Sequence, residues 1–298
     1  MRIIRYLKGN EKQLAAVTNE NEAADLPFSD FMSLIAKARE DNKTAFDIVK
    51  QIADESEKLP LENLQLTTPI DAPEVWASGV TYKKSREARN YEATQGKLDR
   101  ETFYDKVYDA VRPEIFFKST SARTVGPNDP VYLRSDSNWQ IPEPELGLVI
   151  DKDGKVLGYT AGNDMSCRDI EGENPLYLPQ AKVWKNSCSI GPAIVLAETV
   201  SDPYEFQIIC RIYRDEELVF YGDAEVSQLK RTLDELVQYL VLDNQIFDGT
   251  VLLTGTCVVP PNEFTLAEND RIEIEIPGIG ILNNPVVQSQ QVGQTAKG

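Results

Sequence analysis

The chain is organised around the stretch Pro142-Glu143-Pro144-Glu145-Leu146-Gly147-Leu148-Val149-Ile150, in which two carboxylates one residue apart lead into an apolar run. Residues two apart in an extended strand point to the same face, so we expect these side chains to lie together. Buried carboxylates repel one another, and a hard divalent cation such as Mg²⁺ would relieve that repulsion. Alternating glutamates on a solvent-facing strand give the same pattern, so both interpretations stay open for this stretch alone.

A second apolar stretch follows after a short turn. Asp151-Lys152-Asp153-Gly154 predicts the turn, and residues 155–160 are typical of a return strand. That strand would deliver Asp164, just past its end, to a place beside the two glutamates. An aspartate at the exit of a strand is also a common turn residue or helix cap. Asp164 is therefore a third candidate ligand whose role this pattern leaves open.

The charge and the missing residue types exclude whole classes of function. Asp and Glu number 48 against 31 Lys and Arg, which gives a net charge of −17. Such a field repels nucleic acid and anionic membranes, so neither is an expected partner. The chain has no histidine, which excludes a Ser-His-Asp triad, a Cys-His pair and imidazole ligation of a metal. Acid–base chemistry must then use carboxylates, lysine, tyrosine or water bound to a metal.

Length and composition are typical of a soluble globular protein. The 298 residues accommodate one large domain, or a small one beside a large one. Hydrophobic residues make up 41% and charged residues 27% of the chain. No apolar run approaches the ~20 residues of a membrane span, and the N-terminal residues are too interrupted for a signal peptide. The four cysteines form no CxxC motif, so we expect reduced thiols and a cytoplasmic protein.

We place a domain boundary near residue 68, after a polar segment at residues 58–63 that contains a proline. Residues 1–68 would form a small α/β cap, with an N-terminal strand and a helix capped by Ser29. This cap carries no motif for chemistry, and packing is its expected role. Residues 69–298 would form the catalytic domain.

Strands are expected to dominate the chain beyond residue 192. Residues 207–213 and 218–225 alternate around a turn and predict a hairpin, and residues 271–282 predict a second one. Ser227 is the expected cap of a helix with an apolar stripe. The polar residues 288–298 predict a frayed tail.

Several motifs that lie far apart resemble, in order and spacing, the fumarylacetoacetate hydrolase family over roughly residues 70–285. They are Glu143-Pro144-Glu145-Leu146, Gly158-Tyr159-Thr160, residues 163–169, Lys182, Gly191-Pro192 and Thr254-Gly255-Thr256. The resemblance implies an α+β, β-rich fold, with a mixed β-roll catalytic domain of the fumarylacetoacetase C-terminal type beside the small N-terminal domain. It implies Glu143, Glu145 and Asp164 as ligands of Mg²⁺, or of Ca²⁺ or Mn²⁺. It also implies a homodimer or homotetramer.

The sequence departs from the family at the residues that activate water in the hydrolases. There a histidine stands three residues after the tyrosine that matches Tyr82, and a glutamate three residues further on. Here these positions are Ser85 and Ala88, which puts hydrolysis in doubt. The charged residues 83–100 would be a mobile lid over the site or a solvated helix, and Ser85 and Arg86 within them are candidates for substrate binding. Residues 99–111 predict a further helix.

Two segments resemble one branch of the family, the 2-keto-3-deoxy-arabinonate dehydratases. One is residues 109–114, ending in Glu114, and the other is residues 171–180, beginning with Glu171, where the wider family commonly has glutamine. Lys182 stands at the family's Ala-Lys position. A lysine there could be a charge partner, a substrate ligand or a base with a depressed pKa.

We therefore expect a divalent-metal-dependent dehydratase, a hydro-lyase of sugar-acid catabolism. Its substrate would be a 2-keto-3-deoxy pentonate, such as 2-keto-3-deoxy-arabinonate, and its product a 2,5-dioxo acid. Lys182 and Glu114 or Glu171 would transfer protons, and Thr256 would hold the substrate carboxylate. A hydrolase or decarboxylase of a 2-keto acid, or a metabolite-binding protein without catalysis, would use the same motifs.

Overall fold

The computed structural model describes residues 1–94 and 103–288. The predicted frayed tail, apart from its first residue, and the start of the helix predicted at 99–111 lie outside the described residues. No helix among the described residues has the length and apolar character needed to cross a membrane.

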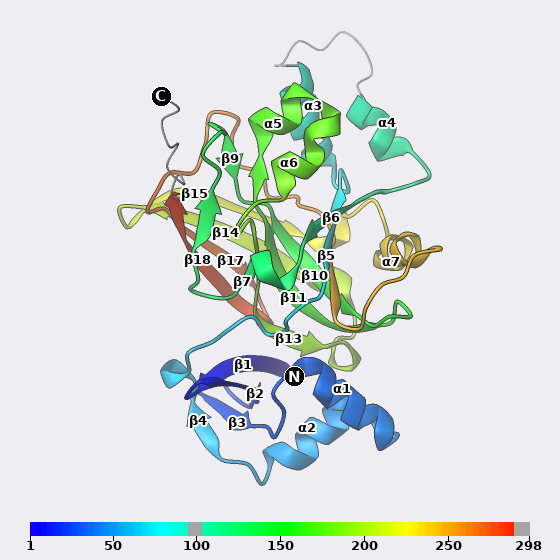
Figure 1. Cartoon of the computed structure of the whole chain (residues 1–298), viewed down its shortest axis with the longest axis vertical. Helices are drawn as coiled ribbons and strands as arrows, with labels where there is room; N and C mark the ends of the chain where they lie inside the picture. Colours follow the sequence, from blue (N-terminus) through cyan, green and yellow to red (C-terminus); the bar gives the residue numbers. More distant parts are fainter. Residues whose placement is uncertain (95–102, 289–298) are drawn as a thin grey trace, which may run out of the picture.

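The N-terminal unit packs two helices against a small antiparallel sheet, blue at the bottom of Figure 1. Its elements are β1 (Arg2–Lys8), β2 (Glu11–Val17), β3 (Glu22–Asp25), α1 (Phe31–Glu40), α2 (Ala45–Ala53), β4 (Lys58–Pro60) and the short 3₁₀ turn η1 (Leu61–Asn63). Ser29 was the wrong prediction for the cap of α1. Asp30 caps it, and its carboxylate accepts a hydrogen bond from the Ser33 amide at 2.9 Å. Asp30 directly precedes the first helical residue, so its side chain reaches the third amide, and aspartate is as good a cap as serine.

The N-terminal unit and the larger body share one sheet. Strand β1 runs antiparallel to β13 (Cys188–Leu196), with Arg2 opposite Val195. Within the described residues this sheet has 11 strands, ten of them in the order β4-β3-β2-β1-β13-β11-β10-β16-β5-β6, with β7 also paired to β13. A division of the chain near residue 68 therefore stays a prediction.

The organising stretch forms β10 (Pro144–Ile150), whose residues are all buried in the middle of this sheet. The return strand β11 (Val156–Asp164) is longer than predicted, and Asp164 lies within it instead of beyond its end. The reason is that both edges of its last residues are paired, with Pro144 opposite Asn163 on one side and Cys188 opposite Asp164 on the other. Strand β16 (Thr250–Leu253) pairs with the far side of β10.

A second sheet packs against this layer and carries the predicted hairpins. It contains β15 (Glu217–Glu225), β14 (Gln207–Arg214), β17 (Arg271–Ile276), β18 (Gly280–Gln288) and β8 (Val131–Leu133), in that order. Alternate residues of β14 and β17, among them Ile208, Ile212 and Ile274, point into the core between the sheets. Both predicted hairpins are confirmed.

Helix α7 (Leu233–Val241) covers this core from the side, with Leu236 and Leu240 buried. The predicted cap Ser227 is wrong, because Ser227 lies in a separate 3₁₀ turn, η6 (Val226–Gln228). Thr232 caps the helix and accepts a hydrogen bond from the Glu235 amide at 3.1 Å.

Helices α3, α5 and α6 gather at the end of the molecule opposite the N-terminal unit (Figure 1). The elements of this end are β5 (Val75–Gly79), α3 (Lys83–Thr94), α4 (Phe103–Asp109), β6 (Glu114–Ser119), β9 (Gln140–Ile141), β12 (Ser166–Cys167), α5 (Arg168–Glu173) and α6 (Leu178–Lys182). The remaining short elements are η2 (Ser121–Arg123), β7 (Thr124–Val125), η3 (Pro175–Tyr177), η4 (Ala197–Thr199) and η5 (Pro203–Glu205). This end carries the charged groups described next.

Candidate metal centre and active site

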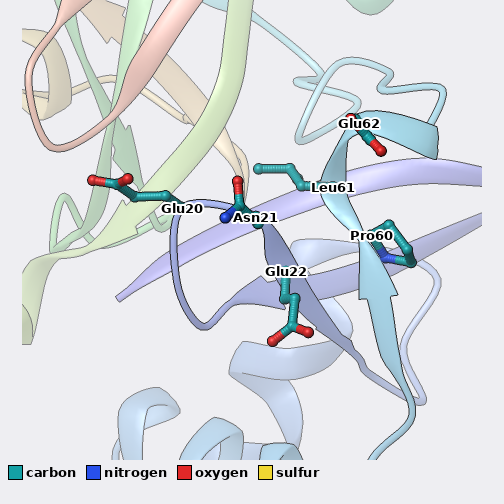
Figure 2. A pocket seen from close by; sticks show the side chains of 6 residues that line it. All are labelled: Glu20, Asn21, Glu22, Pro60, Leu61 and Glu62. Carbon is teal, nitrogen blue, oxygen red and sulfur yellow. The ribbon is translucent and has the colours of Figure 1, made fainter.

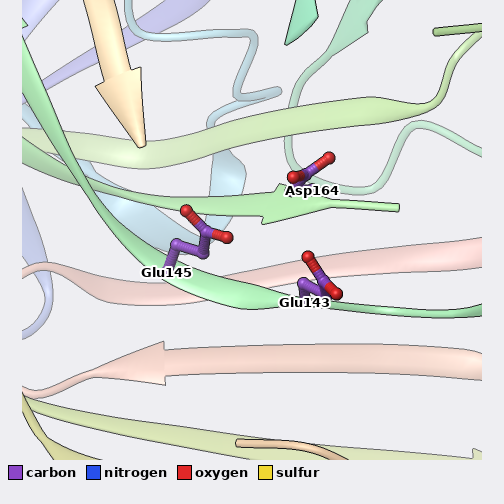
Figure 3. Close-up of side chains that lie close together, drawn as sticks. All are labelled: Glu143, Glu145 and Asp164. Carbon is purple, nitrogen blue, oxygen red and sulfur yellow. The ribbon is translucent and has the colours of Figure 1, made fainter. Parts of the chain in front are cut away.

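Three carboxylates converge where β10 begins and β11 ends. One oxygen from each of Glu143, Glu145 and Asp164 lies within 4.8 Å of the other two, and all three residues are buried. Figure 3 shows the side chains approaching one another from the neighbouring strands. The Asp164 amide donates a hydrogen bond to the Glu143 carbonyl at 3.0 Å, which joins the two backbones at this point. The predicted proximity of the three residues is confirmed.

Lys182, the last residue of α6, inserts its ammonium group among these carboxylates. It donates hydrogen bonds to Glu143 Oε2 at 2.6 Å, to Asp164 Oδ2 at 3.0 Å and to the Ser166 hydroxyl at 2.5 Å. Its Nζ also lies 3.3 Å from Glu171 Oε1. Lys182 is fully buried, so its charge acts on these partners without screening by water.

A second buried lysine, Lys118 of β6, lies on the other side of Asp164. Its Nζ is 2.6 Å from Asp164 Oδ1. It also donates to two backbone carbonyls, that of Met165 at 2.8 Å and that of Lys182 at 2.5 Å. Lys118 thereby ties a candidate metal ligand to the backbone of the lysine on α6.

Burial is the largest influence on the acidic groups of this centre. It raises the pKa of Glu145 well above its ordinary range, and the charges of Asp164 and Glu143 raise it further. Burial also acts to raise the pKa of Glu143. There the attraction to Lys182 and to two arginines outweighs it and lowers the pKa to about 2. The two glutamates of one motif are therefore held in different electrostatic environments.

The same charges decide the state of Lys182. Burial alone would lower its pKa, but the carboxylates of Asp164, Glu143 and Glu171 outweigh burial and raise the pKa above its ordinary value. This environment favours the ammonium form. Of the three roles that the sequence left open, it fits a charge partner or a substrate ligand and not a base with a depressed pKa.

The donor set fits a hard divalent cation. All three groups offer carboxylate oxygens, the ligands that Mg²⁺ and Ca²⁺ prefer. Glu145 accepts a backbone hydrogen bond from the Gly255 amide at 2.7 Å, and no ion pair to it is found within residues 1–94 and 103–288. A buried carboxylate beside two others needs positive charge, and a bound cation would supply it.

Two further carboxylates lie beside this centre. Glu171 of α5 is buried, and its Oε2 lies 2.6 Å from a guanidinium nitrogen of Arg89 on α3. Glu114, the first residue of β6, has a buried Oε2 atom without a hydrogen-bond partner in the described part of the chain. Burial raises the pKa of Glu114, and the charge of Glu171 raises it further. The charges of Arg89 and Lys182 lower it, but burial outweighs them.

The three predicted substrate-binding groups are engaged within the protein. The Ser85 hydroxyl donates to the Tyr82 carbonyl at 2.8 Å. The Thr256 hydroxyl donates to backbone carbonyls of Pro144 at 3.0 Å and Val258 at 3.2 Å. The guanidinium of Arg86 lies 4.7 Å from the centre of the Tyr108 ring. Their predicted roles remain predictions, and each of the two hydroxyls would have to leave its carbonyl to bind a ligand through its proton.

Sequence reasoning missed Lys118 and Arg89. Lys118 ends the apolar run Ile115-Phe116-Phe117, and a lysine closing a buried strand is a signal for a paired charge. Arg89 was hidden in the charged residues 83–100. That segment is a helix over its described part. Ser85, Ala88 and Arg89 are buried on one side of it, so the helix is not fully solvated.

One surface pocket lies in a different part of the chain. It has a volume of about 470 Å³ and lies in the N-terminal unit, between the β2–β3 turn and β4 (Figure 2). Its lining consists of Glu20, Asn21, Glu22, Pro60, Leu61 and Glu62. The carboxylates there are exposed, and the lining contains no cationic or nucleophilic group. This pocket therefore offers no group for nucleophilic chemistry or for pairing with an anionic substrate.

Known proteins resemble the chain over most of its length. Residues 76–287 match the family model for the C-terminal domain of fumarylacetoacetate hydrolase. A 2-dehydro-3-deoxy-D-arabinonate dehydratase from Saccharolobus solfataricus is 46% identical over 232 residues, which is 78% of each chain. A probable 2-keto-3-deoxyxylonate dehydratase from Haloferax volcanii is 49% identical over 220 residues, 74% of each chain.

The fold is also that of a solved dehydratase. A structure of 2-keto-3-deoxy-D-arabinonate dehydratase in complex with magnesium and 2,5-dioxopentanoate superposes with a TM-score of 0.83 at 36% identity. The match covers 98% of this chain and 100% of that one. The similarity therefore includes both the N-terminal unit and the larger body.

Proposed function

This chain belongs to the fumarylacetoacetate hydrolase family, and on that premise we propose that its buried centre removes water from a 2-keto-3-deoxy pentonate. The enzyme is a magnesium-dependent hydro-lyase, and its product is a 2,5-dioxo acid. The observation that carries this conclusion is the set of acid–base groups around the three carboxylates. Glu114 and Glu171 are present there, while Ser85 and Ala88 replace the water-activating pair of the hydrolases.

Glu143, Glu145 and Asp164 would hold the magnesium ion, which when bound supplies Lewis acidity toward the carboxylate and keto oxygens of a 2-keto acid. Lys118 and Lys182 hold two of these carboxylates in place, and their positive charge offsets the repulsion within the set. Lys182 also keeps a proton donor beside the place where the substrate would bind.

Glu171 is the group best suited to remove the proton from carbon 3. Arg89 at 2.6 Å and Lys182 at 3.3 Å fix the position of its carboxylate, and a positioned carboxylate can act as a general base. Glu114 suits the opposite role, since burial raises its pKa and favours the protonated form. Two titratable groups in contrasting environments are the usual arrangement for an acid and a base in one site.

Together these two groups would carry out the elimination of water. Glu171 takes a proton from carbon 3, and that electron pair forms the double bond to carbon 4 as the bond from carbon 4 to its hydroxyl breaks. Glu114 gives a proton to the departing hydroxyl, which leaves as water. Tautomerisation of the unsaturated product then removes one proton from carbon 5 and one from its hydroxyl, adds one proton from solvent to each of carbons 3 and 4, and yields the 2,5-dioxo acid.

A substrate panel tests this function. The enzyme with Mg²⁺ is incubated with 2-keto-3-deoxy acids of different length and configuration and, in parallel, with an acylpyruvate. We expect dehydration of a pentonate and no release of pyruvate from the acylpyruvate. Cleavage of the acylpyruvate without dehydration of any deoxy acid would contradict the proposal.

We further propose that the enzyme is a homodimer or homotetramer in the cytoplasm. The outer face of the β15–β8 sheet exposes Tyr221 and Ile281, large apolar side chains that a second copy would cover. The four cysteines are buried and free, which suits a reducing compartment. Light scattering at micromolar concentration tests assembly, and a monomeric mass would contradict it.

A further inference from the structure

Gly79 lies directly opposite Glu114 where the antiparallel strands β5 and β6 meet. Side chains of directly opposed residues normally stand next to each other on one face of the sheet. Here one partner has no side chain, and the Glu114 side chain lies over the glycine. A Cβ atom built on Gly79 would come within 2.0 Å of Glu114 Oε2, 2.5 Å of Cδ and 3.2 Å of Cγ.

All three of these nearest atoms belong to the Glu114 side chain, so the conflict involves that side chain and no backbone atom. Gly79 does not have a positive φ, so the backbone itself does not demand glycine at this position. The reason for glycine is therefore space, and the group that uses the space is the Glu114 carboxylate.

From this geometry we propose that Gly79 is a positioning residue for catalysis, which acts by leaving the slot that the Glu114 carboxylate occupies. The inference rests on the proposed role of Glu114 as the proton donor. It assigns part of the acid's placement to a residue that has no side chain of its own.

Gly79→Ala is the direct test. The methyl group leaves the backbone free to keep its conformation but forces the carboxylate out of the slot, because a flexible side chain moves more readily than a paired strand. We expect kcat to fall by ~10²–10⁴, the usual worth of a positioned proton-transfer group, while KM and the affinity for Mg²⁺ stay near those of the wild type. A crystal structure of the variant should show the two strands in place and the Glu114 carboxylate displaced.

The matched control repeats the substitution in a Glu114→Ala background, where no carboxylate remains to be displaced. There Gly79→Ala should cause no further loss of turnover, and the thermal stability lost in the single variant should be restored. A carboxylate that stays in place in the Gly79→Ala crystal structure overturns the inference. If Gly79→Ala causes an equal loss of turnover or stability with and without Glu114, the inference is also overturned, because the effect would not depend on the Glu114 carboxylate.

The same set of variants separates this inference from the function on which it rests. If Glu114→Gln keeps wild-type turnover, Glu114 is not the acid. The positioning role of Gly79 is then refuted as well, even if Gly79→Ala displaces the Glu114 carboxylate. If Glu114→Gln is inactive and Gly79→Ala is fully active, the proposed function stands and only the role of Gly79 is refuted.

Discussion

Lys118 and Asp164 form an ion pair of 2.6 Å in which neither side chain is exposed to solvent. The two residues belong to β6 and β11, strands that are separated in the sheet by β10, β16 and β5. The long lysine side chain thus reaches a candidate metal ligand from a strand at the edge of the sheet. Loss of this pair would therefore affect both a candidate metal ligand and the stability of the fold.

Removing the cation from this pair should destabilise the protein. Lys118→Met leaves the Asp164 carboxylate without this partner and two carbonyls without a donor, and breaking a buried pair in this way costs about 3–5 kcal/mol. Lys12→Met is the matched control, because Lys12 pairs with Asp71 at 2.8 Å on the surface, where such pairs contribute ~0–1 kcal/mol. Urea unfolding measures both free energies, and equal values for the two variants would contradict this account.

Glu145→Gln should abolish both metal binding and turnover. Glutamine keeps the shape of the side chain but removes one of the three negative charges that attract the cation. Titration calorimetry with Mg²⁺ measures the binding. Glu62→Gln, in the exposed pocket of Figure 2, makes the same chemical change far from the centre and should leave the affinity unchanged. Normal Mg²⁺ affinity in Glu145→Gln would remove this residue from the ligand set.

Lys182→Ala should lower turnover much more than it lowers the affinity for Mg²⁺. The ammonium group is lost beside Glu143 and Glu171, while the three carboxylates that would hold the ion remain. We expect kcat to fall by ~10²–10⁴. Steady-state kinetics and calorimetry on the same preparation compare the two effects. A parallel loss of turnover and metal affinity would show that Lys182 acts only by positioning the carboxylates and not in proton transfer.

The ionisation of Asp71 should make the free energy of unfolding depend on pH. Partial burial alone would raise its pKa, but hydrogen bonds from Arg5 and Lys12 outweigh burial and lower the pKa to about 2, from an ordinary value of 3.8. A carboxyl group with a lowered folded-state pKa stabilises the fold above the ordinary value, and this stabilisation is lost as the pH falls toward 2.

Asp71→Asn removes that titration. The melting temperature of the wild type should exceed that of the variant at pH 7, and the difference should shrink between about pH 4 and pH 2. A difference that is constant over this range would show that Asp71 acts through its hydrogen-bonding shape and not through its charge.

The convergence of the three carboxylates was predictable from local spacing, whereas their role as metal ligands was implied only by the resemblance to the family. Glu143 and Glu145 are two residues apart at the start of a strand, and Asp164 follows on the strand that pairs with it, so the register of one hairpin brings the three together. The hairpins beyond residue 192 follow from the same two-residue alternation.

The rest of the site depends on contacts between distant segments, which spacing does not encode. Lys118 meets Asp164 because β6 and β11 belong to one sheet, and Arg89 meets Glu171 because α3 packs against α5. The slot at Gly79 is equally invisible in the sequence, since it exists only against Glu114 across the strand pair. The wrong cap at Ser29 is a local error, because its neighbour Asp30 is an equally good cap. Ser227 was wrong because a separate 3₁₀ turn precedes the helix that Thr232 caps.

The most direct test of the central claim is identification of the product formed in deuterated water. Purified enzyme with Mg²⁺ is given 2-keto-3-deoxy-arabinonate, and the product is identified by mass spectrometry and NMR, with an EDTA-treated sample beside it. Our account predicts a 2,5-dioxo acid with deuterium at carbon 3, and no product after EDTA. Unchanged 2-keto-3-deoxy-arabinonate, or the same product in the EDTA-treated sample, would contradict it.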